Sequence, residues 1–387
     1  MKILMVTSIP ENLDNITGGV ESVTVNLLQG FSDLDVEFNV ISFRLEVKKP
    51  SVVEFSPNIK IFYYPFRYIK SIKLFLFLFA SLTIKKQAEA WLPDIIHLQG
   101  NGSSLLQLAR LKNKNVIITP HADQKGEYKN LTGLKKRMKQ KISIFIDHIA
   151  LRKFNNFIFI SEYLRNSLNN NKLLNEVKFQ DVIFNPVNSN FFKVKDNELK
   201  NRLNIFYVGQ ISKRKGLIDL IKAIGELKKK GIVYNLNVAG DFSDSLYKEV
   251  ILSGIKENGL GSQVNFYGWL SQNKIVGLME NNGIFVLPSN QESLPVSIIE
   301  SMSGGRIVIA TEVGGIPEII RNGETGFLYK KNDIKQLVDI LEALYNNPSS
   351  YEIVSRNARK YAENNFSSLI VAKKTKDFYS KIVNQYA

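Results

Sequence analysis

The chain of 387 residues has no cysteine, which excludes disulfides, thiolate nucleophiles and zinc sites built on cysteine. It has three histidines, and no acidic pair is spaced to form a metal cage with them. The longest apolar run is far shorter than the ~20 residues that a membrane-spanning helix needs. The start, MKILMVTSIP, has no cleavage site typical of a secretory signal. A GxxxxGK[ST] loop and a complete dinucleotide fingerprint are also missing, which disfavours ATPase and dehydrogenase functions.

Acidic residues are fewer than basic ones: the chain has 51 Lys and Arg residues and 36 Asp and Glu residues, which gives a formal net charge of +15. The basic residues gather mainly within 60–86 and 129–141, both in the first half of the chain and both next to apolar residues. A solvated charged face is one interpretation, and docking to an anionic lipid surface is the other. We expect no nucleic-acid partner, because the sequence contains no recognisable nucleic-acid-binding module.

Apolar runs without polar alternation are separated by helical stretches throughout the chain. The runs expected as strands are KILMVTS, FNVISF, IKIFYY, DIIHLQ, NVIITPH, FIFISEY and VIFNP, and then NIFYVGQ, YNLNVAG, VNFYGW, GIFVLPS, RIVIAT and GFLY. Continuous apolar strands are typical of parallel sheets that are covered by helices on both faces. The alternation of strands and helices begins again after the polar segment NPVNSNFFKVKDNELKNR. The sequence therefore predicts an α/β fold with two Rossmann-like domains, at 1–187 and 188–366.

The segment NQESLPVSIIESMSGG carries two carboxylates, Glu292 and Glu300, on either side of a proline. It follows the predicted strand GIFVLPS, and ligands of open parallel sheets bind at the turns that leave such strands. Proline favours the first turn of a helix, and free N–H groups at a helix start favour an anion. The residues expected to present this anion site are Ser293, Leu294, Pro295 and Val296.

The spacing of the two carboxylates suits a ligand that has hydroxyl groups on both sides of a phosphate. A carboxylate accepts hydrogen bonds from the hydroxyls of a ribose in dinucleotide sites. We therefore expect Glu300 to hold a ribose, the helix start to hold the phosphates, and Glu292 to hold a second sugar. This pattern predicts binding of a nucleotide-sugar.

A Glu, seven residues and a second Glu before a glycine-rich turn resemble the donor-site signature of the retaining GT-B glycosyltransferases, family four. The resemblance covers nearly the whole chain. The further segments that carry it are GGVE, PDIIHLQG, TPHAD, FISEYLR, VIFNPVN, YVGQISKRKG and GGIPEIIRNGETGFLY. It implies two facing Rossmann-like domains, with the acceptor on 1–187 and the donor on 188–366. It also implies that the last helix, 367–387, crosses back to the first domain.

The resemblance assigns roles to residues of the first domain. His121, in TPHAD, stands at the position of the family's active-site histidine. Gly18 and Gly19, in GGVE, correspond to its N-terminal glycine loop. They follow the first strand and open a helix, a place where the backbone approaches a phosphate or an acceptor.

In the second domain the chain departs from the family at one position. The family has an Arg directly after the glycine of VG and a Lys five positions further, and both bind the departing diphosphate. Here Gly209 is followed by Gln210, and Lys215 stands at the second place. Gln210 brings no charge, so stabilisation of the diphosphate rests more on Lys215, with help from Lys213 or Arg214.

The resemblance implies an enzyme that transfers a glycosyl group from a nucleotide-sugar, with retention, and without a metal or another cofactor. The expected catalytic residues are His121, Lys215 and Glu292. The expected acceptor is a glycan or a lipid-linked glycan, in the synthesis of surface polysaccharide or glycolipid. The resemblance implies a protein that acts in the cytoplasm, either free or at the inner leaflet of the membrane. Two alternatives remain: a nucleotide-sugar 2-epimerase on the same fold, and a non-catalytic glycosyltransferase subunit.

Overall fold

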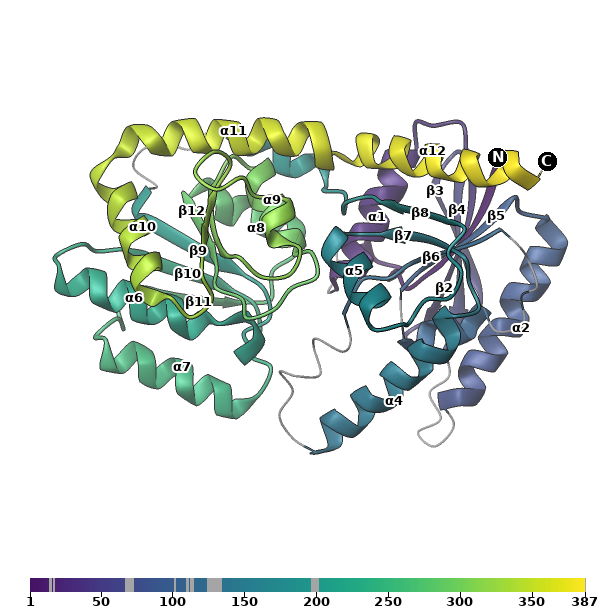
Figure 1. Ribbon diagram of the computed structural model, residues 1–387, viewed down its shortest axis with the longest axis horizontal. Helices are drawn as coiled ribbons and strands as arrows, with labels where there is room; N and C mark the ends of the chain where they lie inside the picture. Colours follow the sequence, from purple (N-terminus) through teal and green to yellow (C-terminus); the bar gives the residue numbers. More distant parts are fainter. Residues whose placement is uncertain are drawn as a thin grey trace. The chain divides into compact units, whose positions relative to one another are not determined.

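The computed structural model describes residues 1–13, 16, 18–66, 73–100, 102–108, 111, 115–123, 134–195 and 202–386. The chain divides into two compact units. Unit 1 comprises Met1–Pro186 and Ser368–Ala387, and unit 2 comprises Val187–Ser367. Each unit is built on one sheet with helices packed against it (Figure 1). The predicted α/β fold with two mainly parallel sheets is confirmed.

Within its described residues, unit 1 has an eight-stranded sheet in the order β3-β4-β2-β1-β5-β6-β7-β8. Its strands are β1 (Lys2–Thr7), β2 (Glu37–Arg44), β3 (Ser51–Ser56), β4 (Ile59–Pro65), β5 (Ile95–Gln99), β6 (Val116–Thr119), β7 (Asn156–Phe159) and β8 (Phe179–Val182). Its helices are α1 (Gly19–Phe31), α2 (Lys73–Trp91), α4 (Leu134–Leu151), α5 (Glu162–Asn170) and α12 (Ser368–Tyr386). The order of strands reverses between β1 and β5.

Unit 2 has a six-stranded parallel sheet among its described residues, in the order β11-β10-β9-β12-β13-β14. The strands are β9 (Asn204–Val208), β10 (Asn235–Ala239), β11 (Val264–Gly268), β12 (Ile284–Leu287), β13 (Ile307–Thr311) and β14 (Phe327–Tyr329). Helices α6 (Leu217–Lys229), α7 (Ser245–Glu257) and α10 (Ile334–Asn346) pack together, and α9 (Val296–Ser303) packs with α11 (Pro348–Phe366). The two groups lie on opposite sides of the sheet (Figure 1), and α8 (Gln272–Glu280) follows β11. Counted from β9, this is the 3-2-1-4-5-6 order of nucleotide-binding doubly wound sheets.

The apolar runs of the central strands are explained by burial on both faces of the sheets. Every residue of β12 and β13 is buried, and so is every residue of β5 and β6. Helices cover both faces of such a sheet, so no position along these strands meets water and no polar alternation is needed. This is why period-two patterning is missing from the sequence of these strands.

Two strands differ from the prediction. β3 was not expected; it pairs antiparallel with β4 at the sheet edge and is largely exposed, so burial imposes no apolar pattern on its sequence. VIFNP was expected as a strand, but β8 covers Phe179–Val182 and ends there. The neighbouring strand β7 ends at Phe159, because Ser161 is already the N-cap of α5. Ile183 therefore makes the last backbone hydrogen bond to β7, and β8 does not continue through the rest of VIFNP.

The last helix, α12, packs on α1 in unit 1. Its residues Val371, Phe378 and Tyr379 belong to the same buried cluster as the side chains of β1, β2 and α1. The contact is close because of Gly30: a Cβ at this position would lie 2.0 Å from the Ser368 carbonyl oxygen. A helical glycine costs roughly 1 kcal/mol relative to alanine, so its presence in α1 has a packing reason. The end of the chain is thereby part of the core of unit 1.

Candidate active site

The sequence-predicted donor residues of unit 2 lie at the point where the order of strands reverses. β9 and β12 are paired neighbours, but their chain connections run to opposite sides of the sheet. Loops that leave two such strands separate and form a crevice at their carboxyl ends. Lys215 lies in the loop after β9, and Glu292 lies in the loop after β12. The topology therefore brings together residues that are far apart in the sequence.

A glycine lets the two loops approach each other. Gly216 ends the 3-10 turn Lys213–Lys215 with φ of 69°, and a Cβ there would lie 1.9 Å from the Pro288 carbonyl oxygen. The backbone N–H of Asn290 donates to the Arg214 carbonyl oxygen over 2.7 Å, and its side chain donates to the Lys213 carbonyl oxygen. Any larger residue than glycine at 216 would push the loops apart.

Glu292 lies between these two loops as a buried anion. Its Oε1 lies 2.6 Å from Lys215 Nζ and accepts a hydrogen bond of 2.7 Å from Ser289 Oγ. Its Oε2 lies 3.4 Å from Arg214 Nη1. Burial alone would raise the pKa of Glu292, but the charges of Lys215 and Arg214, together with the hydrogen bonds from Lys215 and Ser289, hold it below its usual range. Glu292 is therefore ionised at neutral pH and neutralises the cations beside it.

Gly314 packs directly against the backbone of the turn that carries Glu292. This residue has φ of 61°, and a Cβ there would lie 1.7 Å from the Glu292 carbonyl oxygen. The neighbouring Gly315 donates its N–H to the Ser293 carbonyl oxygen over 3.1 Å. Sequence reasoning assigned no role to Gly314 or to Ser289. The GGIPEII segment that carries Gly314 was recognised only as part of the family resemblance.

The helix after this turn covers VSIIESMS, Val296–Ser303, as expected from the sequence, but Pro295 lies just outside it. α9 starts at Val296, and Pro295 is its N-cap with an extended ψ of 121°, so the prediction that Pro295 lies in the first helical turn is wrong. The N–H groups at the helix start are consequently those of Val296 and the residues after it, rather than those of 293–296. Leu294 and Pro295 are buried, which makes them structural supports of the turn.

Glu300 lies inside α9 and is buried, at 6% exposure. Within the described part of the chain its carboxyl has no ion-pair or hydrogen-bond partner, and burial raises its pKa to about 7. The folded pKa lies above the unfolded one, so ionising Glu300 destabilises unit 2 as the pH rises from about 4.5 to about 7. A ligand that donates hydrogen bonds to this carboxylate would offset that penalty.

The strand end before Lys215 carries the residues predicted around the family's arginine position. Gly209 has φ of 150°, and Gln210 is exposed. The Gln210 carbonyl oxygen accepts a hydrogen bond of 3.0 Å from Tyr207. Lys213 is exposed and Arg214 lies beside Glu292, so Arg214 is the second cation next to this carboxylate.

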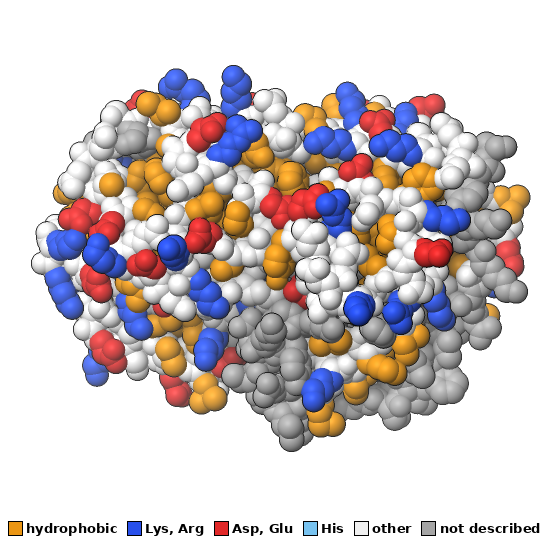
Figure 2. Space-filling view, in the orientation of Figure 1, with side chains coloured by type: hydrophobic (Ala, Val, Ile, Leu, Met, Phe, Trp, Pro, Cys, Tyr) orange, Lys and Arg blue, Asp and Glu red, His pale blue; other side chains and the backbone are white. Residues whose placement is uncertain are grey.

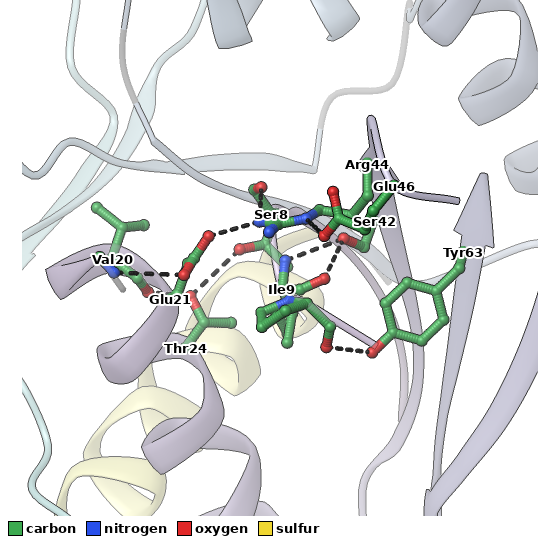
Figure 3. A network of polar contacts seen from close by, with 12 residues as sticks. Ser8, Ile9, Val20, Glu21, Thr24, Ser42, Arg44, Glu46 and Tyr63 are labelled. Atoms are coloured by element: carbon green, nitrogen blue, oxygen red, sulfur yellow. Dashed lines mark hydrogen bonds and ion pairs between the residues drawn. The ribbon is translucent and has the colours of Figure 1, made fainter. Parts of the chain in front are cut away.

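In unit 1 the glycine loop lies between β1 and α1. Gly18 is the N-cap of α1 and donates its N–H to Glu21 Oε2 over 3.3 Å, while Gly19 begins the helix. Glu21 Oε1 lies 2.5 Å from Arg44 Nη1, and Arg44 Nε lies 2.6 Å from Glu46 (Figure 3). A Cβ on Gly19 would meet no atom within 4 Å, so its backbone is accessible. Arg44 was not identified from the sequence.

His121 lies two residues after β6, at the carboxyl edge of the sheet of unit 1. Its Nε2 is 2.7 Å from Gln99 Oε1, at the end of the neighbouring strand β5. Burial lowers the pKa of His121 to about 4, so the ring is neutral at neutral pH. His97 is buried next to it, and burial together with the proximity of His121 lowers the pKa of His97 to about 3.

Among the residues that the structure describes, no three His, Asp or Glu side chains gather as a metal-binding group. The expectation of catalysis without a metal stays a prediction. The structure brings Lys215, Arg214, Glu292 and the start of α9 together in unit 2, and His121 with Gln99 in unit 1.

Two family profiles match the chain side by side. Residues 17–191 match the family described as Glycosyltransferase Family 4, and residues 188–361 match Glycosyl transferases group 1. The capsular polysaccharide biosynthesis glycosyltransferase CapM of Staphylococcus aureus is 28% identical over 269 residues, 65% of this chain and 68% of that protein. The alpha-D-kanosaminyltransferase of Streptomyces kanamyceticus is 24% identical over 68% of this chain and 70% of its own.

Solved structures agree with the fold. The sucrose-phosphate synthase of Thermosynechococcus elongatus has a TM-score of 0.81 at 18% identity, and covers 99% of each chain. The Anabaena protein HepE, solved with UDP and glucose, has a TM-score of 0.74 at 17% identity over 98% of this chain and 100% of its own. The two profiles, the curated relatives and this shared architecture lead to one conclusion. The chain is a glycosyltransferase of the GT-B fold, of the hexosyltransferase type.

Proposed function

We propose that this enzyme transfers a sugar, with retention of configuration, from a nucleotide-sugar bound to unit 2. The proposed acceptor is a glycan or lipid-linked glycan, in the synthesis of surface polysaccharide or glycolipid. The observation that carries the donor assignment is the pair of carboxylates, Glu292 and Glu300, on either side of the start of α9, with Lys215 and Arg214 against the first of them. The relationship to CapM supports the proposed pathway.

Each donor residue has a proposed part in this reaction. Lys215, Arg214 and the start of α9 stabilise the negative charge that develops on the departing diphosphate, in a site where fixed charges act more strongly than in water. Glu292 orients the donor sugar, and Glu300 accepts hydrogen bonds from the ribose. We assign no protein nucleophile, because front-face attack by the acceptor hydroxyl needs none. His121 is assigned to the acceptor side, in unit 1.

Arg214 offers a physical reason why Gln210 is tolerated. Gln210 brings no charge to the position of the family's arginine, but Arg214 Nη1 lies 3.4 Å from the same carboxylate that Lys215 contacts. Two cations therefore remain beside the proposed diphosphate site. We propose that Arg214 takes over the electrostatic part of the missing arginine.

Removal of the Lys215 charge tests the donor site. Lys215→Ala should lower turnover at least ~100-fold, in the range for losing one preorganised donor to a developing charge. Lys213→Ala is the matched control, because Lys213 carries the same charge two residues earlier and is exposed. We expect it to keep turnover within about threefold, as is usual for an exposed charge. Turnover of a panel of nucleotide-sugars, with and without acceptor, is the measurement.

Equal turnover of Lys215→Ala and the wild type would place the diphosphate elsewhere. Donor turnover that yields an epimerised nucleotide-sugar would favour the 2-epimerase alternative, and no turnover with any donor would favour a non-catalytic subunit.

The raised pKa of Glu300 predicts that nucleotide binding is coupled to the release of a proton. The free carboxyl has a pKa of about 7 because it is buried. Hydrogen bonds from ribose hydroxyls stabilise its ionised form, so binding lowers the pKa and releases a proton near pH 7. Calorimetry of UDP binding in two buffers of different ionisation enthalpy measures this release. We expect a smaller release for Glu300→Gln, and an unchanged release would remove Glu300 from the ribose site.

We also propose that unit 1 docks on an anionic membrane surface through α4. Met138, Ile142, Phe145 and Ile149 recur on one face of this helix and are exposed by 57, 59, 64 and 48%. This exposed apolar face is what an interfacial helix presents to lipid. No helix in the described part of the chain is long and apolar enough to span a bilayer.

The basic residues provide the charge complementarity for this docking. Arg67, Lys70 and Lys129 lie outside the described residues, as do the side chains of Lys73, Lys135, Lys136, Arg137 and Lys139. In the sequence, four of these cations flank Met138 on α4. Elsewhere Lys and Arg are interspersed with Asp and Glu over much of the face drawn in Figure 2. Each cation near an anionic surface contributes ~1 kcal/mol.

Vesicle sedimentation tests the docking. We expect binding to vesicles that contain anionic lipid. Binding should be lost at high salt, because the distance over which the charges attract each other, about 10 Å at 0.1 M salt, shortens as the salt concentration rises. Reversal of the charges of Lys135, Lys136, Arg137 and Lys139, or Ile142→Asp, should abolish binding without changing nucleotide affinity. Leu246→Asp is the control, because Leu246 is exposed by 74% on α7 of unit 2. Equal sedimentation with anionic and neutral vesicles at low salt would contradict the proposal.

A further inference from the structure

A chain of hydrogen bonds joins the last helix to His121 within unit 1. The Tyr379 hydroxyl, on α12, lies 2.5 Å from His97 Nδ1, although the two residues are 282 positions apart. His97 Nε2 lies 2.7 Å from Thr119 Oγ1 and 3.4 Å from Gln99 Nε2. Gln99 Oε1 lies 2.7 Å from His121 Nε2. These side chains link α12, β5 and the loop after β6.

The amide of Gln99 gives this chain a direction. Its oxygen accepts from His121, so the proton of the neutral His121 ring is on Nε2 and Nδ1 is free of a proton. Its nitrogen donates toward His97 Nε2, which therefore carries no proton, and the Thr119 hydroxyl donates to the same atom. The proton of His97 is then on Nδ1 and is donated to the Tyr379 oxygen.

The surroundings hold each member of the chain in place. Tyr379 is fully buried; its ring stacks on Phe31 at 6.0 Å and meets the His97 ring edge-on at 5.6 Å. Burial keeps both imidazoles uncharged at neutral pH, and a neutral imidazole has one donor and one acceptor nitrogen. At each imidazole, the direction of the hydrogen bond at one ring nitrogen therefore fixes the direction of the hydrogen bond at the other nitrogen.

We propose that Tyr379 is a positioning residue which, through His97 and Gln99, holds His121 in the tautomer with a proton on Nε2. Nδ1 of the partly exposed His121 ring is then left as a hydrogen-bond acceptor for a hydroxyl of the sugar acceptor. This inference rests on the proposed function, since it uses the assignment of His121 to the acceptor side. It gives the return of α12 to unit 1 a role in the chemistry as well as in the core.

The tautomer can be observed without any assay of activity. The chain has three histidines, so the full-length protein labelled with ¹⁵N-histidine gives few ring signals, which single His→Gln variants assign. In the wild type we expect His121 as one tautomer, with the shifts of a protonated Nε2 and an unprotonated Nδ1. In Tyr379→Phe, the loss of the oxygen that His97 donates to should give a mixture of the two tautomers at His121. Gln99→Leu should also give a mixture, because it removes the amide that joins His97 to His121.

Thr375→Val is the matched control on the same helix. Thr375 is buried on α12 and lines the same small cavity as His97 and His121, but its hydroxyl donates to Val371 of its own helix. This variant perturbs the packing of α12 and leaves the hydrogen-bonded chain intact. We expect the His121 signals of the wild type and the same thermal unfolding midpoint as in Tyr379→Phe, within about 5 °C.

The kinetic result separates this inference from the function on which it rests. Turnover scales with the fraction of His121 in the competent tautomer, so a roughly equal mixture in Tyr379→Phe should lower kcat about twofold, with the KM for donor unchanged. A wild-type His121 with its proton on Nδ1, or unchanged His121 signals in both Tyr379→Phe and Gln99→Leu, would overturn the proposal. Full turnover by His121→Ala would instead overturn the assignment of His121, while the spectra still decide whether Tyr379 sets its tautomer.

Discussion

The buried ion pair between Lys215 and Glu292 is the interaction on which the proposed donor site depends. Breaking a buried pair by removing one partner costs roughly 3–5 kcal/mol, because the other charge stays uncompensated in a site shielded from water. The pair forms because β9 and β12 are neighbours at the reversal of the strand order. Gly216 and Gly314 let the loops approach closely enough for it. The chemistry of the site and the packing of the glycines are therefore parts of one arrangement.

The pair also has a consequence for binding. Without a ligand, Glu292 already occupies the two cations that we assign to the diphosphate. A nucleotide-sugar has to share or replace these contacts, and the carboxylate regains them when the nucleoside diphosphate leaves. Glu292 would then both orient the sugar and weaken the hold on the product. Glu300 has the opposite starting condition, since it is buried without such a cation and its pKa is raised to about 7.

Patterns local in the sequence predicted much of this structure. Continuous apolar runs identified the central strands, because burial on both faces removes polar alternation. The spacing between Glu292 and Glu300 and the glycine-rich loops pointed to the segment that we assign to the donor. Contacts between distant segments could not be predicted this way: neither the pairing of Glu292 with Lys215 nor the link from Tyr379 to His97 leaves a periodic signal. The extended backbone of Pro295 was also missed, because it depends on a turn that Gly314 contacts from another loop. For α4, the spacing of the apolar residues is a local pattern, but their exposure depends on the rest of the fold: no element in the described part of the chain covers them.

The affinity of UDP for the wild type and for Glu292→Gln, measured by calorimetry near pH 7.5, tests the central claim most directly. If Glu292 and the diphosphate compete for Lys215 and Arg214, the variant should bind UDP more tightly, by at least about threefold, the equivalent of a modest ion pair. Glu249→Gln, which removes the same charge from an exposed position on α7, should leave the affinity unchanged. Weaker or equal binding of UDP by Glu292→Gln would contradict the account.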